Sequence, residues 1–383
     1  MKNISNNTAK KKALIFALIV LAIITRAYAQ DYAFKVLATN GNVNLKTSNK
    51  KIWSGSTLSP TDEVVVGANS YVGLMHKGGK TLEIKQAGSY KISDLNSKVG
   101  AANSSTSAKY ASYVAGEMAK ADRQDINKNH RKYMAITGSV ERANPNTAFA
   151  YFAYPKDQHA NPTMDVLNSI VTVRLYGSPL QEGIAKNKTF AIRITDFYGK
   201  VIFTQEIKAD DKGEGLAQLD FSKMQYKGEP SFILEVTVKE AKEPAKERSV
   251  YNINLVSSDS KFQEVKKDAA EYIAEPSALN KMLEARIYEE AQLFLDAATC
   301  YETAIAMEPN VDTYKIAYQD FIARNRMKLM ARKDQSGKLE LAPITINTNV
   351  KDEESYKDGA NTPVEEPKTE EKPKKEKGTK KIK

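Results

Sequence analysis

The chain has 383 residues, of which 41% are hydrophobic, so it can build the cores of two or three ordinary domains. Its formal net charge of +10 overstates the basic character, because the first 29 residues hold five basic residues and no acidic one. The rest has 52 basic residues against 47 acidic residues, too small an excess to predict a nucleic-acid-binding protein. With Cys300 as the single cysteine, no internal disulfide is possible.

The N-terminus has the composition of a secretory signal peptide over residues 1–29. Four lysines precede an apolar run of 12 residues, Ala13 to Ile24, which is too short to span a bilayer comfortably. The small residues Ala27 and Ala29 then predict cleavage before Gln30. The alternative is an uncleaved signal anchor. Both interpretations predict an exported protein, and after cleavage we expect no transmembrane span and no lipoprotein anchor.

Residues 30–96 alternate apolar and polar positions in short runs broken by Gly, Asn, Ser and Pro, which predicts half-buried strands joined by tight turns. A loose pattern recurs in this stretch at Gly41 and Val43, Gly55 and Leu58, the acidic residue and strand from Asp62 to Val66, Val72 and Leu74, then Gly78, Gly79 and Leu82. This pattern resembles the FecR-type β domain. The resemblance implies the fold and not the signalling role, because only twelve residues precede Ala13, where signalling members carry a cytoplasmic domain.

Residues 97–145 are polar and rich in Ser, Ala and Asn, which predicts a linker. One helix is expected within it, over residues 107–123. Tyr110, Tyr113, Val114 and Met118 recur on one side of that helix, which would dock on a neighbouring element.

Residues 146–257 again alternate and predict a second β domain. Its expected strands cover residues 170–176, 189–195, 200–207, 216–221, 231–238 and 250–255. Six strands at this spacing suggest an antiparallel β-sandwich of the immunoglobulin-like type. Three aromatic residues, Tyr151, Phe152 and Tyr154, precede them and either pack between domains or offer a platform for sugars.

In residues 258–333 the apolar period becomes helical, with a helix from Phe262 to Ile273 and another after residue 311. Between them, small and aromatic residues recur at Ala285, Tyr288, Ala297, Tyr301 and Ala304, and Pro309 follows. This segment resembles a tetratricopeptide repeat, in which small side chains let two antiparallel helices approach closely. Lys281 and Glu284 depart from the repeat pattern, and a generic helical hairpin is the alternative.

Residues 334–383 are rich in Lys and Glu, and we expect them to be disordered because they cannot bury enough apolar surface to fold. A solvated tail is the simpler interpretation. The basic end, residues 374–383, could instead touch anionic lipid or glycan.

Several segments match part of a catalytic or ligand-binding motif, and none of them matches the whole motif. Gly78-Gly79-Lys80-Thr81 lacks the first glycine of a phosphate-binding loop and lies between strands. The three histidines, His76, His130 and His159, are scattered, and each is expected at the surface. Asp210, Asp211 and Glu214 lack the spacing of a calcium loop and predict a polar turn. We therefore predict no catalytic, cofactor or metal residue.

Taken together, these segments predict a multidomain protein of β and α class that is not an enzyme. We expect an exported bacterial protein of the periplasm, the cell envelope or the cell surface that acts as a scaffold or adaptor. Its helical module would bind one or more partner proteins. The alternative function is binding of peptidoglycan or another glycan, and a hydrolase with a site assembled from distant residues is a remoter one.

Overall fold

The computed structural model describes residues 32–99, 105–122, 146–155, 161–178, 185–224, 230–241, 248–333 and 339–343. These residues belong to one compact unit that spans residues 1–346. The predicted cleavage site at Ala27, Ala29 and Gln30 lies outside the described residues, as do His130, His159 and the chain beyond Pro343.

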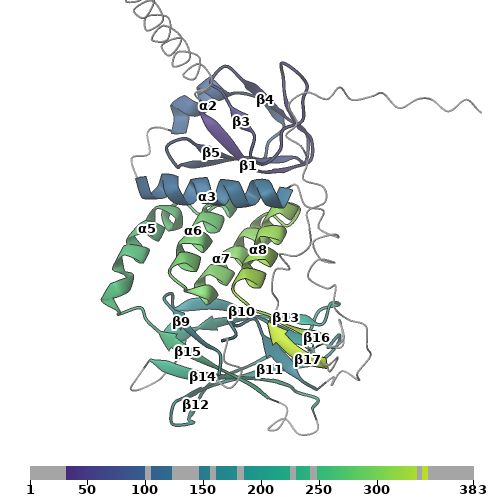
Figure 1. Cartoon of the computed structure of the whole chain (residues 1–383), viewed down its shortest axis with the longest axis vertical. Coiled ribbons are helices and arrows are strands. Elements are labelled where there is room, and N and C mark those ends of the chain that lie inside the picture. The colour runs from purple at the N-terminus through teal and green to yellow at the C-terminus, as the bar shows by residue number, and fades with distance from the viewer. Residues whose placement is uncertain are drawn as a thin grey trace, which may run out of the picture. The chain divides into compact units, whose positions relative to one another are not determined.

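The first described part is a β domain built from short antiparallel strands (Figure 1). Its strands are β1 (Phe34–Asn40), β2 (Val43–Leu45), β3 (Thr57–Leu58), β4 (Glu63–Val66), β5 (Tyr71–His76), β6 (Thr81–Ile84) and β7 (Gly88–Lys91). They form one sheet in the order β3-β1-β5-β6 and another in the order β2-β4-β7. Alternation fills the core between them, as in β4, where Val64 and Val66 are buried and Val65 is exposed.

Helix α2 (Ile92–Val99) closes this N-terminal β domain, and the sequence did not predict it. Ile92 and Leu95 are buried in the same core as Val64 and Val66. The expected domain boundary after residue 96 is therefore wrong, because it would divide a helix whose apolar side belongs to the domain.

Helix α3 (Ser105–Asp122) confirms the helix expected over residues 107–123. It packs against β1 and against the helices that follow later in the chain (Figure 1). Val114 and Met118 are buried as predicted, whereas Tyr113 stays partly exposed.

The second β domain contains all six predicted strands to within two residues at each end. These are β10 (Ile170–Gly177), β11 (Thr189–Asp196), β12 (Val201–Lys208), β13 (Glu214–Asp220), β14 (Ser231–Val238) and β15 (Ser249–Leu255), with a short 3₁₀ turn η1 (Phe221–Lys223). Two further strands, β8 (Ala148–Ala150) and β9 (Thr163–Val166), were not predicted because they are short and owe their pairing to distant segments. The sheets have the orders β13-β10-β8 and β12-β11-β14-β15-β9, all antiparallel except the β15–β9 pair.

A layer of four helices follows, introduced by the 3₁₀ turn η2 (Ser260–Phe262). The helices are α5 (Gln263–Ala274), α6 (Ala278–Glu290), α7 (Phe294–Met307) and α8 (Asp312–Arg324), and each packs on the next. The Ser277 hydroxyl caps α6 by accepting a hydrogen bond from the Asn280 N–H at 3.1 Å. The helices expected from the apolar period are thus confirmed.

The chain then forms a strand pair, β16 (Leu329–Lys333) with β17 (Leu339–Pro343). The expectation that residues 334–383 lack structure throughout is therefore wrong for residues 339–343. A run of five residues is too short for the sequence pattern to identify as a strand. Its conformation depends on pairing with β16, which the local sequence does not show.

The cores are less separate than the sequence suggested. One apolar cluster includes Leu37 of β1, Met118 of α3, Val173 of β10 and Tyr288 of α6. Periodicity shows which side of a helix is apolar, but not which element covers it. Here both β domains pack against the apolar sides of the helical layer.

Candidate functional site

The residues of the repeat signature come together inside the helical layer. Four of them, Ala285, Tyr288, Ala297 and Ala304, are almost completely buried on α6 and α7, and Tyr301 is nearly so. Pro309 lies in the exposed turn after α7. The five signature residues on α6 and α7 hold the helices together, and their buried side chains offer no surface to a partner.

One side of α7 lies along the edge of β10 that β8 leaves uncovered. Side chains three residues apart face this edge, since Asp296, Thr299 and Glu302 share one helix face. The Thr299 hydroxyl accepts a hydrogen bond from the Thr172 backbone N–H at 2.8 Å. The helix therefore replaces a neighbouring strand and satisfies the strand edge with side chains.

Asp296 is the most enclosed acid of this stripe, with 1% of its surface exposed. Its carboxylate accepts hydrogen bonds from the backbone N–H groups of Leu167 and Asn168, at 2.9 Å and 2.8 Å. Burial raises the pKa of Asp296 to about 7, and the two backbone hydrogen bonds oppose that rise without cancelling it. Asp296 thus fixes the turn between β9 and β10 onto α7.

A charged cluster continues the same joint. Arg174 of β10 donates two hydrogen bonds to Glu302 and one to Glu214. Glu214 also accepts from the Tyr151 hydroxyl at 3.0 Å and from Lys328 Nζ at 3.1 Å. Burial favours a raised pKa for Glu214, but the charges of Lys328 and Arg174 outweigh it and lower that pKa. Each ionic group is paired, so the cluster is structural in character.

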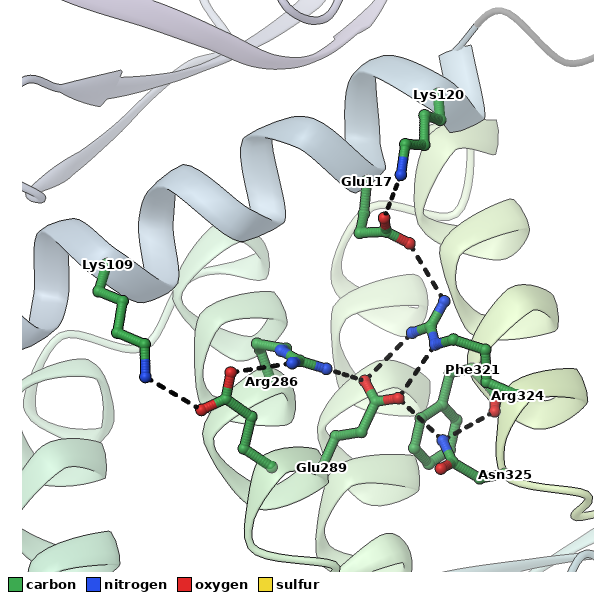
Figure 2. Close-up of polar contacts among 9 residues, drawn as sticks. Lys109, Glu117, Lys120, Arg286, Glu289, Phe321, Arg324 and Asn325 are labelled. Atoms are coloured by element: carbon green, nitrogen blue, oxygen red, sulfur yellow. Dashed lines mark hydrogen bonds and ion pairs between the residues drawn. The ribbon is translucent and has the colours of Figure 1, made fainter.

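Helix α3 crosses the helical layer and contacts α6 and α8 (Figure 2). Glu117 of α3 accepts a hydrogen bond from Arg324 of α8 at 3.2 Å, and Arg324 also binds Glu289 of α6 at 3.1 Å. The Arg286 guanidinium forms an ion pair with Glu289 and lies 3.7 Å from the centre of the Tyr113 ring. This chain of charges ties α3 to both helices.

The N-terminal β domain also binds the helices. The hydroxyl groups of Tyr71 on β5 and Tyr314 on α8 are 2.7 Å apart. Glu83 of β6 accepts a hydrogen bond from the Leu279 backbone N–H at the start of α6, at 2.9 Å. The chain's own elements thus cover part of the helical surface on which the sequence predicted a protein partner. The sequence pattern predicted that this surface is open to a partner, because the pattern does not show which distant segments of the chain pack on a helix.

An exposed feature that was not predicted from the sequence is the turn between β11 and β12, which we call the aromatic hairpin (residues 196–200). Phe197 and Tyr198 at its tip are 75% and 88% exposed. Large apolar rings with this exposure are unusual on a turn, where polar residues are the rule. The aromatic pair between the turn residues Asp196 and Gly199 was the signal in the sequence.

The backbone of the aromatic hairpin is held in one conformation. The Asp196 carboxylate accepts hydrogen bonds from the N–H groups of Tyr198 and Lys200, at 3.0 Å and 2.8 Å. Gly199 has a φ of +83°, which glycine adopts without strain. Behind the tip, β11 is paired on both sides, with β12 and β14. A rigid tip can bind with little loss of conformational entropy.

The other aromatic candidates are inside the molecule. Phe152 is buried against Tyr251, with ring centres 4.6 Å apart. The Tyr154 hydroxyl lies 3.0 Å from the Tyr251 hydroxyl. With Tyr151 bound to Glu214, these three residues pack between elements, and the sugar platform considered for them is not available.

The residues of the incomplete catalytic motifs have structural roles. Residues 77–80 turn between β5 and β6. His76 is buried, not at the surface as expected, and its ring binds Asn96 Oδ1 at 2.9 Å and accepts the Gly78 N–H at 3.0 Å. Asp210 accepts two backbone N–H groups in a polar turn. Burial raises the pKa of the Cys300 thiol well above its usual value, so little nucleophilic thiolate forms.

A hollow of about 500 Å³ opens between β9, η2 and the α6–α7 turn. Met164, Phe262 and Phe294 supply apolar walls. Its charged residues are Asp165, which accepts a hydrogen bond from the Asn254 amide, and Lys261, which lies 4.0 Å from Asp165. The hollow therefore brings together no acid pair and no nucleophile with a base.

The described ranges hold neither a metal-binding cluster nor a membrane-spanning helix. In that part of the chain, no group of three or more His, Cys, Asp or Glu side chains could hold a metal ion. Likewise, none of its helices is both long and apolar enough to cross a membrane.

No model of a known protein family matches the chain, and no curated protein does. Among solved structures, the catalytic domain of an LPMO from Listeria monocytogenes aligns with 27% of this chain at 11% identity. This chain spans 64% of that domain's length, with a TM-score of 0.17, which is too low to bear on fold or function.

Proposed function

We propose that the protein is a non-catalytic scaffold or adaptor of the bacterial cell envelope, and that it binds a partner protein through the aromatic hairpin. The carrying observation is the exposure of Phe197 and Tyr198 on a turn that Asp196 holds fixed. Aromatic residues on a rigid support are the usual anchors of protein interfaces, because they bury much area and lose few rotamers on binding.

The same proposal includes a finer assignment of the three folded parts. The N-terminal β domain would be of the FecR type, the second β domain an immunoglobulin-like sandwich, and α6 with α7 a tetratricopeptide-like pair. The sheets β13-β10-β8 and β12-β11-β14-β15-β9 share one apolar core, which supports the sandwich. The buried positions of Ala285, Ala297 and Ala304 support the repeat.

The location in the envelope rests on the N-terminal sequence. A basic start, a short apolar run and the Ala27-Tyr28-Ala29 pattern support export and cleavage. Sequencing the N-terminus of protein from the native envelope should give Gln30 as the first residue. Protein that keeps Met1 or Lys2 would contradict cleavage.

Site-specific photocrosslinking in the native cell tests the binding site. A benzophenone amino acid in place of Tyr198 should give a discrete crosslinked product with one partner. The matched control carries the same amino acid at Ile273, an exposed apolar position on α5. Products at position 273 and none at position 198 would move the binding site away from the aromatic hairpin.

Replacing Phe197 and Tyr198 by Ser tests the role of the rings. Both side chains are exposed, so the free energy of unfolding should change by less than about 0.5 kcal/mol. Crosslinks formed from other positions should nevertheless disappear, because the anchors of the interface are gone. Unchanged crosslinking in a folded variant would contradict the proposal.

Glycan binding is a second candidate, since the ring of Tyr198 is exposed enough to stack on a sugar. Sedimentation with purified cell wall separates the two functions. If the protein pellets with the wall and the double Ser variant does not, the hairpin binds glycan. If neither pellets while crosslinks to a protein form, the scaffold function stands.

A further inference from the structure

We propose that a second surface, formed by Lys50, Lys51 and Trp53, docks onto an anionic lipid bilayer. These three residues, called here the tryptophan patch, lie on the N-terminal β domain, and the proposal does not depend on the aromatic hairpin. Trp53 is the only tryptophan of the chain and is 50% exposed.

The sequence around the patch has one sign of charge. Residues 32–61 contain four lysines and no aspartate or glutamate. Lys46 forms an ion pair with Glu63 at 2.8 Å. Lys50 and Lys51 are exposed, and within the described part of the chain no ion pair reaches them. Lys51 therefore places an uncompensated positive charge beside the indole ring, and Lys50 adds a second one on the preceding residue of the chain.

The backbone presents these side chains in a fixed arrangement. The Leu45 N–H donates to the Lys50 carbonyl, and the Ile52 N–H donates to the Val43 carbonyl, both at 2.9 Å. Extended backbone sends alternate side chains to opposite sides, so buried Ile52 anchors the segment while Lys51 and Trp53 point outward. Lys51 Nζ lies 4.3 Å from the centre of the Trp53 ring.

The turn after the patch is fixed as well. The Trp53 N–H donates to the Ser56 hydroxyl at 3.2 Å, and the Ser56 N–H donates to the Trp53 carbonyl at 3.0 Å. At Gly55 the chain passes close to α3, since an added Cβ would lie 2.7 Å from the Ala119 Cβ. Helix α3 thus supports the turn from behind.

The chemistry of the patch fits the headgroup layer of a membrane. Indole rings favour this layer because it offers apolar and polar surroundings together, and lysine ammonium groups bind its phosphates. The charges require a negative partner. Lys51 covers one face of the ring, which leaves less of the ring for stacking on a sugar and favours a bilayer over an anionic polysaccharide.

The intrinsic fluorescence of the full chain tests this site directly, because Trp53 is its only tryptophan. Vesicles that mix phosphatidylcholine with phosphatidylglycerol should shift the emission to shorter wavelength, and vesicles of phosphatidylcholine alone should not. Cosedimentation should weaken as salt is raised. A protein that pellets with anionic vesicles without a change in emission binds through another surface and contradicts the proposal.

Charge variants separate the patch from general electrostatic attraction. Replacing Lys50 and Lys51 by Gln should weaken cosedimentation by roughly 30-fold. Each of the two lysines contributes an equal part of the binding free energy to an anionic surface, so the two losses add. The matched control replaces Lys208 and Lys212, exposed lysines of the second β domain, by Gln. Equal losses in the two double variants would show that only net charge matters and would overturn the proposal.

Two further measurements complete the test. Trp53→Ala should weaken cosedimentation by roughly tenfold, with an unchanged circular dichroism spectrum, since half of the ring is already exposed. Polygalacturonate serves as a soluble anionic polysaccharide. A shift in emission with polygalacturonate and none with anionic vesicles would assign the patch to glycan and reject the bilayer.

Discussion

Arg174 on β10 and Glu302 on α7 are joined by two hydrogen bonds, Nε to Oε1 at 2.6 Å and Nη2 to Oε2 at 2.5 Å. This pair links the second β domain to the helical layer. Because the pair lies largely out of water, removing one partner leaves the other charge poorly compensated.

The first prediction concerns this pair. Glu302→Ala should lower the free energy of unfolding by about 3 kcal/mol, since Glu214 alone then faces Arg174. The control is Glu206→Ala, which breaks a solvent-exposed pair with Lys239 and should cost much less, because water screens that pair. Urea denaturation followed by circular dichroism measures both. Equal losses would mean that the Arg174 pair does not couple the two parts.

The second prediction concerns pH. The pKa of Asp296 is about 7 in the folded protein against 3.8 for a free aspartate. The folded state therefore holds the proton more tightly, so the stabilisation is complete below about pH 4 and is lost as the pH rises to about 7. Asp296→Asn does not titrate. Its free energy of unfolding relative to the wild type should rise over this range, by at most about 4 kcal/mol.

Glu214 supplies a comparison of opposite sign. Its pKa is lowered in the folded protein, so its contribution is present above the free value of 4.5 and is lost as the pH falls below it. Glu214→Gln should therefore lose its disadvantage against the wild type in acid. If the Asp296→Asn and wild-type curves run parallel from pH 4 to pH 7, the buried carboxyl does not titrate as inferred.

Local pattern predicted much of the fold. The alternation in β14, where Phe232, Leu234 and Val236 are buried, and the helical period of α7 are properties of neighbouring residues. Strand β9 was missed because Thr163–Val166 is short and owes its place to parallel pairing with β15. Such pairing depends on residues almost ninety positions away and leaves no local signal.

The binding surface was predicted less well, for a related reason. The apolar stripes of α7 and α8 were correct, but Tyr301 packs on Tyr318 and Phe321 at 5.5 Å and 4.9 Å within the chain. The residues left exposed, Phe197 and Tyr198, lie in a turn for which the sequence pattern predicted no role. Residues 258–333 form part of a core that both β domains share, so deleting them would disturb those domains as well. Point variants are therefore the better probes of the helical layer.

The third prediction compares two glycines that have positive φ. Gly199→Ala places a Cβ in open space, so only the backbone conformation is strained, at a cost of about 1 kcal/mol. Gly55→Ala has the same backbone problem and also brings its Cβ to 2.7 Å from Ala119. It should cost about 1 to 3 kcal/mol more. Thermal unfolding of both variants measures the difference, and equal costs would show that α3 does not support this turn.

The last prediction tests the helix pairing inferred from the repeat signature. Ala297 is fully buried on α7, and its N–H continues the helix by donating to the Leu293 carbonyl at 2.9 Å. Replacing Ala297 by Leu adds three carbon atoms where the helices approach closely, so the free energy of unfolding should fall by about 1 to 3 kcal/mol. Ala306→Leu makes the same change at the exposed C-terminal end of α7 and should cost less than about 0.5 kcal/mol. Urea denaturation of the two variants gives the comparison. If Ala297→Leu is as stable as Ala306→Leu, small residues are not what sets the distance between these helices, and the tetratricopeptide-like register proposed for them is wrong.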